Sequence, residues 1–343
     1  MSQFIELKDI EMIIRRSKKE QSKKIPQEIT IKNNSLMVMK MLENFNKPVS
    51  TIKDLLDDKE VAEYLKDKSV STKKNYYLIL RDIAIYDKIV NGRDNDKVID
   101  EFYKKVGALD QSKKTDEAKG KMSEKKTIKM ELTDADIETL LKLLKENGLH
   151  KEFVIFSILN QYPYRAEIAT LKLISLKEYN QLKKTNTLGK TNYLINGTRK
   201  MSISRGDYKT AETYGRIETE MTGNAKKVLK EYIKSNNIAE GQSLFGFTND
   251  ELVKRLSYIT NKYLKVSLSV NSLAKLTIRR NIIALHKTEK YKSAVETEKT
   301  RMDKAVMEQL AQIRGTSTEI LYNSYLRDWF INRRNATIKH FYI

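Results

Sequence analysis

The chain of 343 residues contains no cysteine, which excludes disulfide bonds and thiolate zinc sites. Its three histidines, His150, His286 and His340, lie far apart in the sequence, so a histidine-based metal site is not expected either. The chain has only three prolines, which favours a helical fold. We therefore expect no metal and no cofactor, and any chemistry must come from arginine, lysine, tyrosine and carboxylate side chains.

Long apolar runs are absent too, because none approaches the roughly 18–20 residues that span a bilayer. The segment Met1–Met12 already includes Glu6, Asp9 and Glu11, which is unlike a secretion signal. These features predict no membrane partner, and a protein that stays in the cytoplasm or in the compartment that holds its partner.

Positive charge, in contrast, is abundant. The chain carries 65 Lys and Arg residues against 45 Asp and Glu residues, which gives a formal net charge of +20 and a sequence pI of about 9.6. Such an excess predicts a polyanionic partner, and nucleic acid is the usual one.

The sequence divides into a basic start, two folded regions and a polar linker. Residues 1–34 are predicted as a basic N-terminal extension, whose Arg15 and Arg16 either contact phosphates or belong to a solvated helix face. Residues 35–107 show short amphipathic helical patterns, the longest following Ser71 as its N-cap. Residues 108–130 are polar and are predicted as a linker.

Residues 131–343 are predicted as the second domain. Thr133 and Asp136 form a capping-box pattern before an apolar helical repeat, and Gly148 suits the position just after that helix. A buried helix is predicted over 153–159, with further helices over 225–235 and from Asn271 or Ser272 to His286.

Between these helices, apolar and polar residues alternate over 193–195, 201–203 and 217–221. Alternation bounded by Gly and Asp predicts a β-hairpin. Lys209 lies in its connection, where a lysine either reaches a ligand as a point charge and proton donor or is a solvated turn residue. The whole pattern predicts a mainly α fold with a small β-hairpin or sheet, the second domain being α+β.

Other polar clusters in the second domain suit phosphate chemistry. Arg165 follows a proline-marked turn at the start of an apolar helical pattern, where a helix N-terminus and a guanidinium both attract phosphate. Arg279 and Arg280 interrupt a strongly apolar helix, so at least one of them needs a buried partner or a ligand. Arg314 and Tyr322 mark a fourth cluster. Taken singly, each arginine also fits a structural salt bridge, and the tyrosine fits a core position.

The order of these groups, namely arginine, hairpin lysine, helical arginine and C-terminal tyrosine, resembles the tyrosine recombinase and type IB topoisomerase superfamily. Tyr164–Leu171 is similar to the first arginine box of that family. Tyr208–Gly215 is similar to the hairpin lysine segment of viral and mobile-element members, and Leu276–Arg280 to the second arginine box. Ser317–Tyr322 resembles the segment that leads into the nucleophile, and residues 35–107 resemble the core-binding domain.

Two family positions differ in this chain. The second box usually carries a histidine three residues before its arginine, and here that residue is Leu276, with Lys275 beside it. The third box usually carries a histidine or tryptophan about two helical turns before the tyrosine, and here that neighbourhood holds Arg314. Lys275 and Arg314 are therefore the cations expected to compensate, while His286 is interpreted as a structural helix residue.

The resemblance implies a site-specific DNA recombinase or integrase of a virus or mobile element, which cleaves and rejoins strands through a 3′-phosphotyrosyl intermediate. It implies a helical core-binding domain followed by a catalytic domain, double-stranded DNA as the partner, and a homo-oligomer on DNA, either a dimer or a tetramer. The alternatives are a monomeric type IB topoisomerase and a DNA-binding relative without catalysis, which the absent histidines favour. The C-terminal tail packs either on a neighbouring protomer or on its own domain.

The residues implied for each role are as follows: for catalysis Arg165, Lys209, Arg279, Arg314 and Tyr322, with Lys275, Arg280 and Tyr325 as alternatives, and for DNA contact Arg15, Arg16, Lys73 and Lys74.

Overall fold

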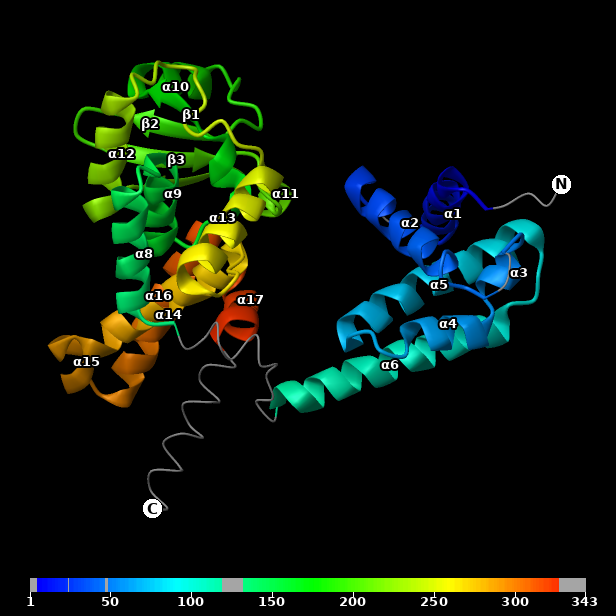
Figure 1. The fold of residues 1–343 in the computed structure, drawn as a ribbon. Helices are drawn as coiled ribbons and strands as arrows, with labels where there is room; N and C mark the ends of the chain where they lie inside the picture. The colour runs from blue at the N-terminus through cyan, green and yellow to red at the C-terminus, as the bar shows by residue number, and fades with distance from the viewer. Residues whose placement is uncertain (1–4, 24, 47–48, 119–131, 327–343) are drawn as a thin grey trace. The chain divides into compact units, whose positions relative to one another are not determined.

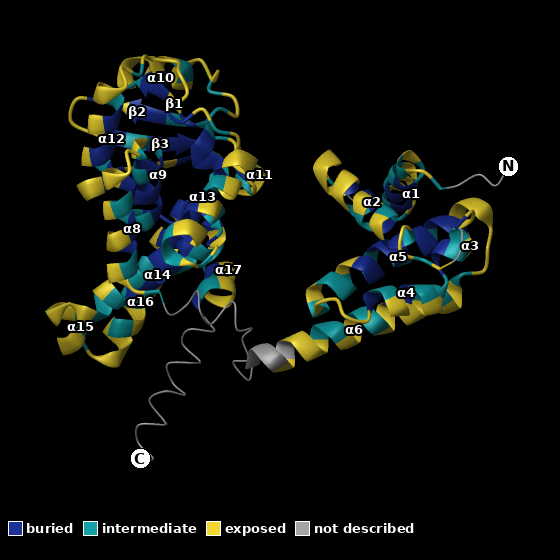
Figure 2. Ribbon diagram, viewed as in Figure 1, coloured by how far each residue is buried: buried dark blue, intermediate teal, exposed yellow. Residues whose placement is uncertain are grey.

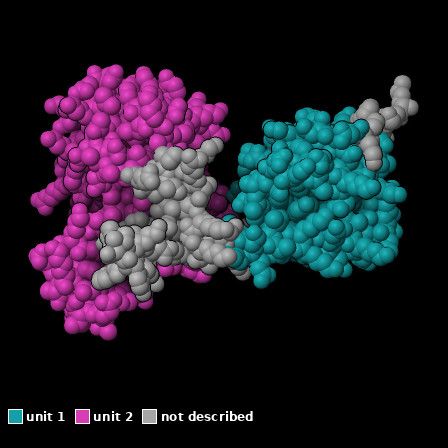
Figure 3. Space-filling view, turned by 60° about the horizontal axis from the view of Figure 1, so that its bottom comes forward, with its two compact units in different colours: residues 1–121 teal, residues 122–343 magenta. Residues whose placement is uncertain are grey.

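The computed structural model describes residues 5–23, 25–46, 49–118 and 132–326. The chain forms two compact units, residues 1–121 and 122–343 (Figure 1 and Figure 3). Each unit has its own buried apolar core (Figure 2). The C-terminal tail and residues 119–130 of the predicted linker lie outside the described residues.

The first unit is helical. Its elements are α1 (Leu7–Glu20), α2 (Glu28–Leu42), α3 (Ile52–Leu55), α4 (Asp58–Leu65), α5 (Val70–Asn91) and α6 (Asp96–Ala118).

The prediction of an N-terminal extension over 1–34 was wrong, because α1 and the start of α2 are part of the first unit. Ile10, Ile13 and Ile14 recur at helical spacing on one face of α1 and are buried in the core of the unit. The basic residues of α1 occupy the remaining faces, which is why charge hid the apolar stripe.

The linker was also predicted to begin too early, since residues 108–118 continue α6. Phe102 of α6 is buried, and Val106 and Leu109 pack against the same core. The long helix α5 begins after Ser69, whose hydroxyl accepts a hydrogen bond from the backbone N–H of Thr72, so the cap lies two residues before the predicted one.

The second unit contains α8 (Asp134–Glu146), α9 (His150–Gln161), η1 (Ala166–Thr170), β1 (Lys172–Ser175), α10 (Leu176–Lys184), β2 (Tyr193–Asn196), β3 (Met201–Arg205), α11 (Ala211–Tyr214), β4 (Ile217–Glu220), α12 (Gly223–Ser235), α13 (Asn249–Leu264), α14 (Val270–Lys287), α15 (Glu289–Ser293), α16 (Glu296–Arg314), α17 (Thr318–Leu321) and a π-helical turn, η2 (Tyr322–Leu326).

The start of this unit follows the sequence pattern closely. Thr133 and Asp136 form the predicted capping box of α8, and Gly148 follows the helix with a positive φ of 68°. The predicted buried helix is α9. The start of α14 is displaced, because Ser269 rather than Asn271 or Ser272 caps it.

The sheet has the strand order β1-β2-β3-β4, in which β1 pairs with β2 in parallel and the other pairs are antiparallel. The predicted hairpin is confirmed as β3 and β4, whereas β1 was not predicted. Leu173 and Leu194 are opposite each other and face the main core, while Ile174 and Ile195 face α10. The sheet is therefore covered on both faces.

A smaller core joins the C-terminal elements α14, α16, α17 and η2 through Ile278, Ile282, Leu310, Leu321 and Leu326. The fold class is thereby confirmed as mainly helical with a small sheet in the second unit. Within the described ranges, no helix is both long and apolar enough to cross a membrane.

Candidate active site

Lys209 lies on the connection between β3 and β4, residues 206–216. Asn192 fixes the start of this connection, because its Oδ1 accepts hydrogen bonds from the backbone N–H groups of Gly206 and Asp207, both at 2.9 Å. The Asn192 side chain also donates to the Asp207 carbonyl oxygen at 2.9 Å. The lysine side chain itself is exposed and makes no hydrogen bond or ion pair with the described part of the chain.

The far end of the connection is fixed as well. The Tyr208 hydroxyl donates to the Gly215 carbonyl oxygen at 2.6 Å. Arg216 donates from Nη2 to the carbonyl oxygens of Gly189 and Thr191, both at 2.9 Å. Lys209 is thus exposed to solvent on a connection that hydrogen bonds fix at both ends.

The Arg165 side chain contacts both this connection and the segment that follows α16, and the contacts centre on the carbonyl oxygen of Gly315. Its Nη1 donates to the Gly315 carbonyl oxygen at 3.3 Å and lies 3.5 Å from the Thr210 hydroxyl oxygen. The Thr210 hydroxyl donates to the same Gly315 carbonyl oxygen. Nε and Nη2 of Arg165 make no hydrogen bond to described residues, and the side chain is half-buried. A guanidinium held by one nitrogen with two others available is suited to bind an oxyanion.

Gly315 is required at this junction. It ends α16 in the left-handed conformation, with φ of 66°. A Cβ atom added there would lie 2.5 Å from a ring carbon of Tyr208. The absence of a side chain therefore lets the Lys209 connection approach the end of α16.

Arg314, which the sequence predicted as a catalytic cation, is fully buried. Its Nη1 donates to the carbonyl oxygens of Pro163 and Tyr164, and its Nη2 donates to the Asn271 side chain. Nε and Nη2 also donate to the Tyr325 hydroxyl, at 3.3 and 3.2 Å. Burial lowers the pKa of this guanidinium, although an arginine stays protonated in proteins. Arg314 therefore holds other segments together.

Arg279 and Arg280 of α14 have different surroundings. Arg279 is 8% exposed, and burial together with the neighbouring Arg280 lowers its pKa. Arg280 forms an ion pair with Asp134 at 3.1 Å and also contacts Asn160. Arg280 is thus occupied by a structural pair at the start of α8.

The two candidate nucleophiles both lie on η2. Tyr322 is 39% exposed, whereas Tyr325 is half-buried against the small C-terminal core. Lys275 places its Nζ 5.7 Å from the centroid of the Tyr325 ring. The structure therefore surrounds Tyr325 with cations and leaves Tyr322 accessible.

Leu276 and His286 both have structural surroundings. Leu276 is buried in the main core of the second unit. His286 contacts Asp303 at 2.8 Å and stacks on Tyr291 with ring centroids 4.3 Å apart, joining α14 to α15 and α16. Burial and the hydrogen bond to Asp303 raise the pKa of Tyr291 to about 12.

The sequence pattern failed to single out Arg205, although it carries a signal. Met201, Ile203 and Arg205 alternate along β3, which places the arginine on the buried face of the sheet. The side chain is fully buried and forms an ion pair with Glu167 at 2.6 Å. It also donates to the Ile313 carbonyl oxygen.

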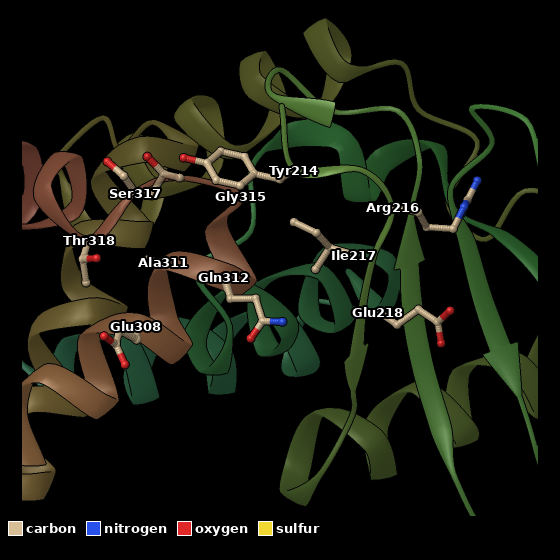
Figure 4. A pocket seen from close by; sticks show the side chains of 11 residues that line it. Tyr214, Arg216, Ile217, Glu218, Glu308, Ala311, Gln312, Gly315, Ser317 and Thr318 are labelled. Carbon is tan, nitrogen blue, oxygen red and sulfur yellow. The ribbon is translucent and has the colours of Figure 1, made fainter. Parts of the chain in front are cut away.

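A cleft of about 450 Å³ adjoins this site (Figure 4). One wall is formed by Tyr214 and Ile217 from the β3–β4 hairpin, and the other by Glu308, Gln312 and Ser317 from α16 and the turn that follows. The cleft is thus bounded by the same two segments that meet at Gly315.

The candidate DNA contacts of the first unit are partly engaged within the protein. Arg15 pairs with Glu28, Lys74 pairs with Asp110 at 2.5 Å, and Lys73 donates to a backbone carbonyl oxygen at 2.8 Å. Arg16 is exposed. Such surface pairs are weak, about 0–1 kcal/mol, so they do not prevent a lysine or arginine from moving to a phosphate.

No protein-family model matches the chain, and no curated protein matches it. Among solved structures, the crystal structure of XerA recombinase has 12% sequence identity to the chain and a TM-score of 0.40. That match covers 96% of this chain and 98% of the recombinase chain.

Proposed function

We propose that this protein is a DNA strand transferase of the tyrosine recombinase type, which cleaves and rejoins strands through a 3′-phosphotyrosyl intermediate. The observation that carries the proposal is the meeting at Gly315. There the Arg165 guanidinium and the hydroxyl of Thr210 both donate a hydrogen bond to the carbonyl oxygen of Gly315. Thr210 follows Lys209 in the chain, and Gly315 follows Arg314. The segments that carry Arg165 and Lys209, which lie far apart in the chain, thus meet at the end of α16.

In this proposal, Arg165 and Arg279 bind the non-bridging oxygens of the scissile phosphate. Their contribution grows as negative charge develops in the pentacoordinate transition state. Arg314 is bonded to the Arg165 segment, the start of α14 and η2 and holds these three together.

Tyr322 is the proposed nucleophile, because it is exposed and ends the segment that resembles the family motif. Its oxygen attacks phosphorus, the phenolic proton passes to solvent, and the bond from phosphorus to the 5′ oxygen breaks. The ammonium group of Lys209 donates a proton to that leaving oxygen and is reprotonated by solvent. A 5′ hydroxyl reverses these steps and rejoins the strand.

The net positive charge supports engagement of duplex DNA through phosphate contacts, which are independent of sequence and weaken as salt rises. Arg16 and Lys73 are proposed contacts in the first unit. Assembly as a dimer or tetramer on DNA, and an origin in a virus or mobile element, extend the proposal through the resemblance of the Lys209 segment.

The test is a covalent protein–DNA adduct that survives denaturation. Supercoiled plasmid and nicked duplex are incubated with the protein at low salt, denatured with detergent and resolved by electrophoresis. We expect an adduct that Tyr322→Phe abolishes. An adduct that survives Tyr322→Phe but not Tyr325→Phe would move the nucleophile to Tyr325.

A second function, DNA binding without cleavage, is favoured by the burial of Arg314 and by Leu276 at the usual histidine position. Binding of DNA by wild type with no adduct on either substrate would establish it. Relaxation of any supercoiled plasmid would instead indicate a topoisomerase, and cleavage at one sequence a recombinase.

A further inference from the structure

Arg205 ends β3, immediately before the connection that carries Lys209. Its Nη1 donates to Glu167 at 2.6 Å, and its Nη2 donates to the Ile313 carbonyl oxygen. Glu167 lies two residues after Arg165, and Ile313 directly precedes Arg314. One guanidinium therefore connects all three segments that meet at Gly315.

The orientation of the Arg205 guanidinium is fixed by two aromatic rings. Its Cζ lies 4.8 Å from the centroid of the Tyr164 ring and 5.1 Å from that of Tyr208. Tyr164 precedes Arg165, and Tyr208 precedes Lys209. Stacking against aromatic faces restrains a planar cation far more than it restrains a lysine ammonium group.

Stability alone does not account for a charge at this position. Arg205 is fully buried, and its Nε has no hydrogen-bond partner in the described part of the chain. A buried ion pair usually gains little over apolar residues of similar size, because both charges lose their hydration. The alternation along β3 would be satisfied equally by an apolar side chain.

We propose that Arg205 is a positioning residue that sets the relative placement of Arg165, Lys209 and the turn after α16. This inference rests on the proposed function, because those residues matter through the strand-transfer reaction. Arg205 itself contacts no substrate. It acts through Glu167, the two tyrosine rings and the Ile313 carbonyl oxygen.

The test compares Arg205→Lys with Arg255→Lys. Arg255 of α13 forms a similar pair, 2.7 Å from Glu152, and its guanidinium lies 5.8 Å from the Tyr258 ring centroid. That pair does not connect the segments of the site, so its substitution controls for loss of an arginine–glutamate pair. A lysine at 205 keeps the charge but cannot bond Glu167 and the Ile313 carbonyl oxygen with a planar fork.

For Arg205→Lys we expect single-turnover cleavage at saturating DNA to fall at least about tenfold, because small misplacements of reacting groups are costly. The Kd for DNA should stay within about twofold, since that affinity comes mainly from phosphate contacts elsewhere. Amide hydrogen exchange should accelerate in residues 206–216 and 314–317. Arg255→Lys should change neither the rate nor this exchange.

If Arg205→Lys fails to fold, the double variant Arg205→Met with Glu167→Gln removes both charges and is measured in the same way. The inference would be overturned if an Arg205 variant cleaved at the wild-type rate with unchanged exchange. It would also be overturned if the variant lost cleavage rate, DNA affinity and thermal stability in parallel. If wild type forms no adduct, the proposed function fails. Exchange then decides the inference alone, because selective acceleration in 206–216 and 314–317 supports it and unchanged exchange overturns it.

Discussion

The buried guanidinium of Arg314 donates two hydrogen bonds to the Tyr325 hydroxyl, from Nε at 3.3 Å and from Nη2 at 3.2 Å. Its remaining bonds reach Asn271 and the backbone just before Arg165. A buried cation at the end of α16 thus joins η2 to the segment just before Arg165. Arg314 therefore supports η2, the turn that also carries Tyr322.

Tyr325→Phe removes the acceptor of both bonds from Arg314. Because buried charged donors left without a partner are costly, we expect a loss of about 1–3 kcal/mol in the free energy of unfolding. Urea denaturation measures this loss. The covalent adduct should still form, though more slowly, since Tyr322 keeps its hydroxyl but its supporting turn is loosened.

The control for this change is Tyr322→Phe on the same turn, at a residue that is 39% exposed. Its effect on unfolding should be smaller than that of Tyr325→Phe, because substitutions at exposed positions usually change stability by less than about 0.5 kcal/mol, while the adduct disappears. Equal stability losses for the two variants would contradict the supporting role of Tyr325.

Gly315→Ala places a methyl group where the Tyr208 ring lies. The left-handed backbone alone costs about 1–2 kcal/mol with a Cβ atom, and displacement of the ring adds to that cost. We expect a total loss of about 3 kcal/mol together with impaired strand cleavage. Thermal denaturation and the adduct assay check the two parts.

Gly148→Ala provides the matched control. Gly148 has nearly the same φ, 68°, but apart from its own neighbours in the chain no atom of the described residues lies within 4 Å of the Cβ position. Gly148→Ala should lose only the stability that the strained left-handed backbone costs, about 1–2 kcal/mol, and should leave cleavage unchanged. Similar losses in both variants would show that the contact with Tyr208 has no energetic importance.

Much of the fold could be predicted because it is encoded locally. The capping box of Thr133 and Asp136 places α8. Charge misled the prediction at α1, where Ile10, Ile13 and Ile14 form a stripe among lysines and arginines. The candidate site required tertiary information, since Arg165 and Gly315 are 150 positions apart. Nothing in the local pattern of either residue indicates that contact.

Tyr179 of α10 and Glu218 of β4 form a pair that should make stability depend on pH. The Tyr179 hydroxyl donates to Glu218 at 2.6 Å, and burial followed by this hydrogen bond raises the Tyr179 pKa to about 12. Burial raises the pKa of Glu218, but the hydrogen bonds from Tyr179 and Lys183 outweigh it and leave that pKa below its usual range.

Tyr179→Phe should therefore lower the free energy of unfolding most at intermediate pH, by about 1–2 kcal/mol near pH 7. On the acid side, stability from a carboxylate with a lowered pKa is present above the unfolded value, near 4.5, and is lost as pH falls. On the alkaline side, stability from a phenol with a raised pKa is full below 10 and is lost as pH rises to about 12. Urea denaturation of wild type and variant across pH measures the difference, and a constant difference would contradict the pair.

Lys209→Ala tests the proposed general acid directly. Loss of a proton donor to the 5′ oxygen should slow cleavage by about 10²–10⁴-fold. The Kd for DNA should change little, because Lys209 is one cation among 65 Lys and Arg residues. As a matched control, Lys184→Ala removes an exposed lysine from α10 and should leave the cleavage rate unchanged.

A substrate with sulfur in place of the bridging 5′ oxygen should restore cleavage by Lys209→Ala, because a thiolate leaves without protonation, the thiol pKa being about 8.5. Slow cleavage of the sulfur substrate as well would assign Lys209 to phosphate binding instead of proton transfer, since a missing charge contact affects both leaving groups alike.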